Sequence, residues 1–80
     1  MEFTFTEKFE EGEILVEYRI LKGEKYQIAG REIFKNKVVE NISPELFYSE
    51  EETKCWCRYL CENKVLPSSL NYVLRDELYI

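Results

Sequence analysis

The sequence contains no histidine, and this absence removes several kinds of catalytic and metal site. Without an imidazole there is no Ser-His or Cys-His nucleophile pair, no histidine acid or base, and no histidine-containing zinc site. The three glycines stand apart from one another, so the chain has no glycine-rich phosphate-binding loop and no dinucleotide fingerprint. Apolar runs do not exceed three residues, as at 14–16, which is far too short to cross a membrane.

What is present indicates a folded, acidic domain. Eighty residues, 45% of them hydrophobic and 15% aromatic, predict one domain spanning 1–80. Eleven basic and sixteen acidic side chains leave a net charge of −5, which disfavours direct binding to nucleic acid. No signal-peptide pattern opens the sequence, and the cysteines do not form a disulfide framework. We therefore expect a cytoplasmic protein of a bacterial cell, either native or phage-encoded, with no membrane association.

The first quarter of the chain alternates between apolar and polar residues, which predicts an antiparallel hairpin. A two-residue loop at Glu11 and Gly12 would place every large apolar residue on one face of the hairpin. That register pairs Phe9 with Ile14, Phe5 with Tyr18 and Phe3 with Ile20. It also puts Glu7 in the apolar row, opposite Val16, where an inward-leaning charge would protect an edge strand from aggregation.

Two further strands are predicted before residue 43. A three-residue loop would set Tyr26 beside Ile20 and Ile28 beside Tyr18, which continues the apolar face. Ile28 and Ile33 cannot share a face in an unbroken strand, so we expect a bulge at residues 29–30. A turn at 36–37 then leads into a short strand over 38–42. Residues 1–42 are thus predicted to form a three- or four-stranded antiparallel meander.

The second half of the chain has helical periodicity. Ser49 followed by Glu52 has the spacing of a helix capping box, and the next apolar stripe comprises Trp56, Cys57, Leu60 and Cys61. We expect this helix to end near 63–64 and a second helix to start at 67–68, with an apolar side formed by Leu70, Val73, Leu74 and Leu78. Residues 43–80 would then be a two-helix layer packed on one face of the meander, giving an α+β two-layer sandwich.

Three cysteines lie close together near the middle of the second half. Cys57 and Cys61 share a helix face, whereas Cys55 points elsewhere, so a closed metal site would need Glu62 or a second chain. The glutamates at 50–52 oppose thiolate formation in this segment. We expect the cysteines to be small core or incidental residues, with no metal and no cofactor.

Acidic and aromatic side chains are the features most open to a functional interpretation. Glutamates cluster near the first hairpin and near the first helix, and six Tyr, five Phe and one Trp exceed what a small core easily holds. Acidic clusters also keep a protein soluble and favour helix starts. We identify as candidate partner-binding residues Glu10, Glu11, Glu13, Glu45, Phe47, Tyr48, Glu50, Glu51 and Glu52.

Several segments resemble a family of small clostridial and related Firmicutes proteins of unknown function. The resemblance is carried by residues 18–20, 26–28, 39–44 and 60–67, together with Leu70 and Val73. It implies strands followed by two helices and a Gram-positive host or its phage, and it implies no site. In size, charge and mixed composition the chain is also similar to small acidic phage inhibitors, including anti-CRISPR proteins, although no motif is shared.

The sequence therefore predicts a protein that is not an enzyme. The leading hypothesis is a small acidic inhibitor or regulator that binds a protein partner, which could handle nucleic acid and be blocked by carboxylates that imitate phosphates. A second hypothesis is an assembly module that homodimerises through a sheet edge or exposed aromatic side chains. A third is a minor metal or redox role for the cysteines.

Overall fold

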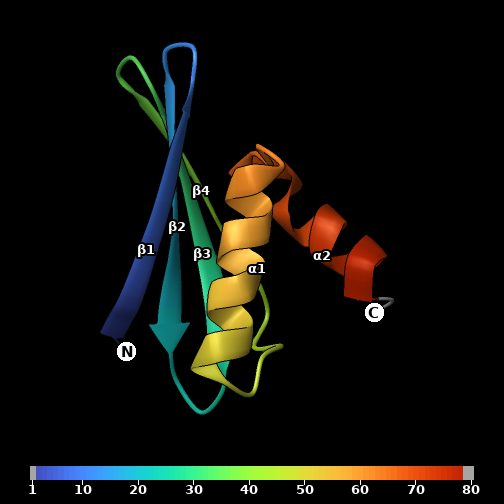
Figure 1. Ribbon diagram of the computed structural model, residues 1–80. Helices are drawn as coiled ribbons and strands as arrows, with labels where there is room; N and C mark the ends of the chain where they lie inside the picture. Colours follow the sequence, from blue (N-terminus) through green and yellow to red (C-terminus); the bar gives the residue numbers. More distant parts are fainter. Residues whose placement is uncertain (1, 79–80) are drawn as a thin grey trace.

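The computed structural model describes residues 2–78 and confirms the predicted α+β architecture. One antiparallel sheet has the order β1-β2-β3-β4, with strands β1 (Glu2–Glu11), β2 (Ile14–Lys22), β3 (Tyr26–Phe34) and β4 (Lys37–Ile42). It is followed by α1 (Glu50–Glu62), the 3-10 helix η1 (Pro67–Ser69) and α2 (Leu70–Leu78). The helices lie on one side of the sheet, and the β1–β2 and β3–β4 hairpins extend beyond them (Figure 1). No helix in the described range is long and apolar enough to span a membrane.

The face predicted to be buried in β2 is confirmed, but the predicted register of the first hairpin is wrong by two residues. Phe9 pairs with Val16 rather than with Ile14, and the two-residue loop is formed by Gly12 and Glu13. Gly12 takes the first loop position with a φ of 61°, the positive value that favours glycine there in a tight hairpin turn. A shift by two preserves which face each side chain occupies, so Glu7 stays in the helix-facing row, opposite Tyr18.

The N-terminal end of β1 departs from the expected alternation. A register shift lies between Phe3 and Phe5, so that Phe5 pairs with Ile20 and Phe3 pairs with Leu21. The irregularity moves Phe3 to the opposite face of the sheet from Phe5, which corrects the prediction that all three phenylalanines share one face. Phe3 is 49% exposed there, with the Arg19 guanidinium carbon 3.9 Å from its ring centroid.

The register of β3 also differs by two residues from the prediction, and the predicted bulge at 29–30 is not there. Ile28 pairs with Ile20, and the ladder between β2 and β3 runs regularly from Lys22 and Tyr26 to the far end. Gly30 instead allows a close approach of buried groups. A Cβ atom at this position would lie 2.8 Å from Cε1 of Tyr18 and 3.0 Å from Cβ of Pro67. Because β3 stays regular, Ile33 lies on the face away from Ile28.

The fourth strand and both helices agree with the sequence pattern. The turn before β4 is formed by residues 35–36, one residue earlier than expected. Ser49 caps α1, because its Oγ accepts a hydrogen bond from the Glu52 N–H at 3.1 Å. The helix ends at Glu62, and Lys64, with a φ of 52°, turns the chain toward η1.

The core lies between the helix-facing row of the sheet and the two helices. Its fully or nearly buried members are Val16, Tyr18, Ile20, Ile28, Phe47, Cys57, Leu60, Leu70 and Leu74. The Tyr18 hydroxyl donates a hydrogen bond to the Val65 carbonyl, which ties the sheet to the segment that joins the helices. Helices and core thus occupy one face, and among residues 2–78 no second layer covers the other face of the sheet.

Candidate interaction surface

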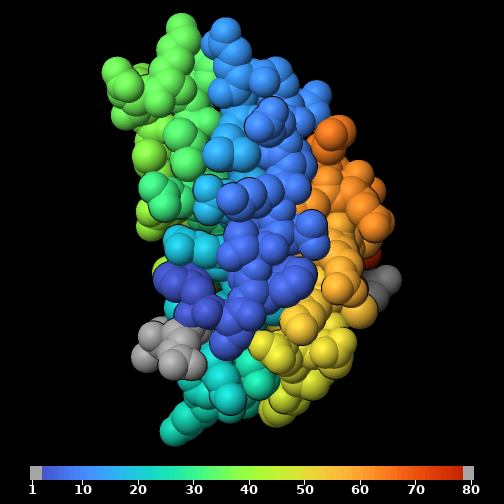
Figure 2. All heavy atoms as spheres, turned by 60° about the vertical axis from the view of Figure 1, so that its left-hand side comes forward, coloured from blue at the N-terminus to red at the C-terminus, as the bar shows by residue number. Residues whose placement is uncertain are grey.

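The uncovered face of the sheet is formed by the residues that alternate with the buried row. In β2 these are the odd-numbered positions from Leu15 to Leu21, and the pairing carries the same face onto the neighbouring strands. In the space-filling view the strands form one continuous surface, with α1 along one side of it (Figure 2). We refer to this surface as the open face. Its side chains form four rows that cross the strands.

A row of four charged side chains of alternating sign crosses the middle of the open face. Lys8 pairs with Glu17, Glu17 with Arg31, and Arg31 with Glu40, so each strand contributes one charge. Between Arg31 Nε and Glu40 Oε1 the distance is 3.8 Å. We call these four residues the charge row. Attraction between neighbours at this exposure contributes about 0.2–1 kcal/mol per pair.

Apolar side chains flank the charge row on both sides. Toward the hairpin tips, Leu15, Ile33 and Val38 lie side by side on β2, β3 and β4. Toward the other end, Ala29 and Ile42 follow Arg19 across the sheet. Val38 and Ile42 are 47% and 49% exposed, although valine and isoleucine are among the residue types most often buried.

Two arginines of the open face retain unused hydrogen-bonding capacity. The Nε atoms of Arg19 and Arg31 are both shielded from solvent, yet neither has a hydrogen-bond acceptor among residues 2–78. A guanidinium presents its donors in a fixed planar fork suited to carboxylates. The open face therefore carries two guanidinium cations beside its apolar side chains, with their Nε atoms turned away from solvent.

The structure separates the candidate acidic residues into two groups. Glu10, Glu11 and Glu13 lie at the β1–β2 hairpin, at the top of Figure 1. The glutamates at 50–52 form the first turn of α1, which lies toward the bottom of the same view. Glu11 Oε2 lies 3.3 Å from Lys64 Nζ. The two groups therefore do not form one contact surface, and they flank the molecule at either end of its 34 Å long axis.

The aromatic candidates differ in exposure. Tyr48 is 78% exposed, beside the acidic start of α1, and Lys25 Nζ lies 4.8 Å from its ring centroid. Phe47 was expected on the surface, but it is buried, with 1% exposure. It forms a backbone bridge with Tyr26 and its ring lies 6.4 Å from that of Trp56, because the loop before α1 folds back as a short extension of the sheet. Phe47 is thus a core residue.

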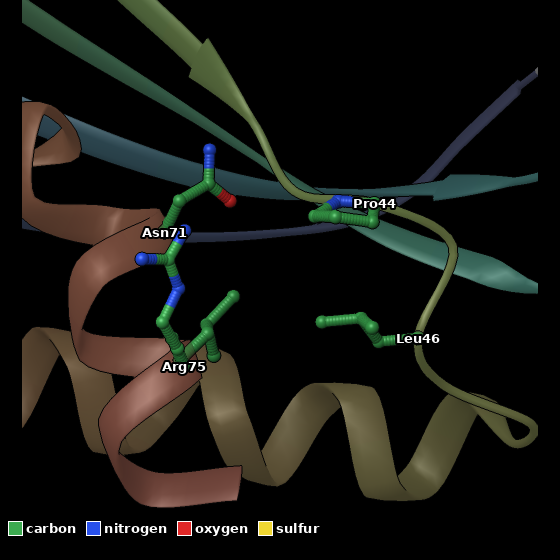
Figure 3. A pocket seen from close by; sticks show the side chains of 5 residues that line it. Pro44, Leu46, Asn71 and Arg75 are labelled. Carbon is green, nitrogen blue, oxygen red and sulfur yellow. The ribbon is translucent and has the colours of Figure 1, made fainter. Parts of the chain in front are cut away.

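A small hollow separates α2 from the loop before α1. It has a volume of about 240 Å³ and is lined by Pro44, Leu46, Asn71, Leu74 and Arg75, and Figure 3 shows Asn71 and Arg75 side by side on α2, across from Pro44 and Leu46. Asn71 donates from Nδ2 to Asn41 Oδ1 at 3.3 Å, while its own Oδ1 has no partner within the described residues. The hollow can accommodate one apolar side chain next to a cation.

The cysteines divide as the helix geometry predicts. Cys57 is fully buried, Cys61 is half-buried and Cys55 is exposed, and all three are free thiols. Burial raises the pKa of Cys57 to about 12, and it raises that of Cys61 to about 11, with nearby Glu7 adding to both shifts. Thiols with such pKa values stay protonated at neutral pH and are poor nucleophiles and metal ligands.

Of the residues that form the open face, Glu10 alone was among the candidate site residues. The sequence did carry a signal for them, because the positions between the buried residues of β2 and β3 include two arginines and a glutamate rather than small polar residues. The order of charges along the row depends on strand register, which the hairpin pattern alone does not determine.

Comparisons of this chain with protein-family models, curated proteins and solved structures find no match. The resemblance to a clostridial family and the likeness in type to phage inhibitors therefore stay predictions.

Proposed function

We propose that this chain is a non-enzymatic interaction domain of the bacterial cytoplasm, an inhibitor or regulator that binds a protein partner through the open face. The observation that carries the proposal is the exposure of Phe3, Val38 and Ile42, each near half, on a sheet face that no other part of the described chain covers. Apolar side chains interspersed with arginine are typical of protein-binding surfaces. The guanidinium groups of Arg19 and Arg31 add positive charges that suit the carboxylates of a protein partner.

Differential capture tests this proposal. The tagged chain and a Val38→Glu/Ile42→Glu variant are each incubated with a clostridial lysate and with an untagged, isotope-labelled copy of the chain. Mass spectrometry then compares what each retains. We expect the parent to retain at least one protein, either its own labelled copy or another, and the variant to lose it, because two buried carboxylates without partners oppose association. A set of proteins that is the same for parent and variant would contradict binding through the open face.

The control for this experiment is Tyr72→Glu. Tyr72 is 71% exposed on α2, on the helical side of the molecule, so the substitution adds a charge far from the open face. We expect it to retain what the parent retains. Circular dichroism of all three proteins verifies that the variants stay folded.

A second candidate function uses the acidic start of α1. Tyr48 is the most exposed large apolar side chain described, and it lies next to the glutamates at 50–52 and close to Glu45. An exposed tyrosine within a group of carboxylates suits a basic groove on a partner, including one that otherwise holds nucleic acid. A Glu50→Lys/Glu51→Lys/Glu52→Lys variant that captures the same basic proteins as the parent at low salt would exclude this candidate.

A further inference from the structure

We infer that the open face binds a second copy of this chain, stacked face to face about a two-fold axis that runs parallel to the strands between β2 and β3. The inference rests on the proposed function of the open face and names its partner. The order of the charges in the charge row, the small and large side chains that flank it and the arrangement of the strand edges support it.

The two-fold axis determines which charges meet. Rotation about an axis parallel to the strands reverses the strand order, so β1 faces β4 of the second copy and β2 faces β3 of the second copy. Lys8 then faces Glu40 of the second copy, and Glu17 faces Arg31 of the second copy. Because the signs alternate over an even number of strands, all four contacts across the row join opposite charges.

Other stackings of the same two faces lack this complementarity. Rotation about an axis perpendicular to the strands and along the charge row keeps the strand order. Lys8 then faces Lys8 of the second copy, and Glu17 faces Glu17 of the second copy. Like charges placed opposite each other at an interface oppose association. The alternating signs therefore select one two-fold arrangement over the other.

On the two central strands, the side chains on either side of the charge row also match under this axis. Leu15 faces Ile33 of the second copy, so the apolar side chains on the hairpin-tip side of the charge row contact each other. Arg19 faces Ala29 of the second copy, so a long side chain meets the smallest one on the face. Interdigitation of large and small side chains is what two sheets about 10 Å apart require.

The size of the face suits a weak dimer. The sheet has strands of 10, 9, 9 and 6 residues. With strands about 4.8 Å apart and a rise of about 3.4 Å per residue, it spans roughly 600 Å² per copy. Two copies would bury roughly 1,200 Å² in total, which is at the low end of specific interfaces. We therefore expect reversible association with a dissociation constant in the micromolar range.

Pairing of two copies through the β4 edge is less well supported. The Ile42 N–H donates to Asn41 Oδ1 at 3.1 Å, and the Ile42 carbonyl accepts from Asn71 Nδ2 at 3.4 Å. These bonds occupy backbone groups at one end of a strand only six residues long. A strand added to this edge would find a short ladder. The stacked arrangement and the edge arrangement predict different effects of charge reversal at Glu17.

Sedimentation velocity on charge-reversal variants tests the inference. Glu17→Arg puts two arginines opposite each other at both symmetric contacts, and Arg31→Glu puts two glutamates there. We expect the parent to dimerise at about 100 μM and each variant to show a dissociation constant at least about tenfold higher. An equimolar mixture of the two variants restores opposite charges at both contacts, so we expect a heterodimer to form at close to the parent's affinity.

Two matched controls change the net charge by the same amounts away from the open face. Glu24→Arg lies in the β2–β3 loop, and Lys22→Glu lies at the exposed end of β2. We expect both to dimerise like the parent. Thermal melts of all variants show whether each is folded. A heterodimer that forms when the Glu17→Arg and Arg31→Glu variants are mixed cannot result from a folding defect.

Each outcome decides the inference. Dimers of either single variant as tight as the parent's, or a mixture that stays monomeric, would overturn the stacked arrangement. A monomeric parent at about 100 μM would also overturn it, while the proposed function would still be tested by differential capture of another protein. If capture is the same for the parent and the Val38→Glu/Ile42→Glu variant, it is the proposed function that fails.

Discussion

Replacing Gly30 with alanine is expected to destabilise the fold through a steric conflict at the sheet–helix boundary. The new Cβ would lie 2.8 Å from Cε1 of Tyr18, 3.0 Å from Cβ of Pro67 and 3.2 Å from its Cγ. Tyr18 and Pro67 are fully buried, and the Tyr18 hydroxyl is held by the Val65 carbonyl. Neither ring can move away without disturbing the core.

The magnitude follows from two opposing terms. Overpacking in a well-packed core costs about 1–3 kcal/mol, and alanine in place of glycine in a strand returns about 0.5–1 kcal/mol. We expect a net loss of about 1–2 kcal/mol in the free energy of unfolding. For a domain of this length each kcal/mol corresponds to about 6 °C, so the melting temperature should fall by about 6–12 °C.

Urea unfolding and thermal melts followed by circular dichroism measure this loss. Gly12→Ala is the matched control. Its Cβ would meet nothing within 4 Å, so any loss in its free energy of unfolding comes from the positive φ of 61° alone. Near-ultraviolet spectra separate the two, because the Gly30 variant should alter the environment of Tyr18 and the Gly12 variant should not. A Gly30→Ala protein as stable as the parent would refute the close-contact explanation.

Three further predictions concern the core and the first helix. Tyr18→Phe leaves the Val65 carbonyl without its donor, and we expect urea unfolding to show a loss of about 1–3 kcal/mol. Ser49→Ala removes the N-cap of α1 and should cost about 1 kcal/mol in the same assay. Unfolded thiols ionise near pH 9, whereas the pKa of folded Cys57 is raised to about 12, so the unfolded chain binds fewer protons above pH 9. Stability should therefore be unaffected by this thiol well below pH 9 and fall between about pH 9 and 12, with a shallower fall in Cys57→Ala; equal slopes would contradict the pKa shift.

The faces of the strands and helices could be predicted from the sequence because side-chain periodicity reports burial directly. Val16, Tyr18 and Ile20 recur every second residue, and all are fully buried. The α1 stripe from Trp56 to Cys61 recurs with helical spacing, and its central members Cys57 and Leu60 are fully buried. Periodicity of this kind depends on local backbone geometry alone, which is why the layer order followed from it.

Register could not be predicted in the same way, because a shift by two leaves every side chain on its face. The choice between Phe9 opposite Ile14 and Phe9 opposite Val16 depends on whether Gly12 takes the first or the second loop position. Gly30 gave a misleading signal, since a strand glycine marks either a bulge or a close approach. At Gly30 the close approach involves Pro67, which is 37 residues away along the chain and therefore cannot be inferred from the residues around the glycine.

Burial of Phe47 was missed for a related reason. The segment between β4 and α1 contains a proline, a glutamate and two serines, a composition typical of an exposed loop. Its fold depends on long-range contacts: the Tyr26 N–H donates to the Phe47 carbonyl at 2.8 Å, and Ser43 Oγ accepts from the Ile28 N–H at 2.9 Å. These hydrogen bonds hold the loop against β3 and place the Phe47 ring in the core.

The distribution of charge separates the open face from the rest of the molecule. Although the chain carries a net charge of −5, the open face holds three basic and three acidic side chains: Lys8, Glu10, Glu17, Arg19, Arg31 and Glu40. The surplus of negative charge therefore lies on other surfaces, including both acidic ends. Two copies repel each other when they approach through those ends and meet no net repulsion when the open faces approach. Added salt should consequently weaken the ordered contacts of the charge row and also relieve the repulsion between the ends, so the stacked dimer should depend less on salt than capture through the glutamates at 50–52.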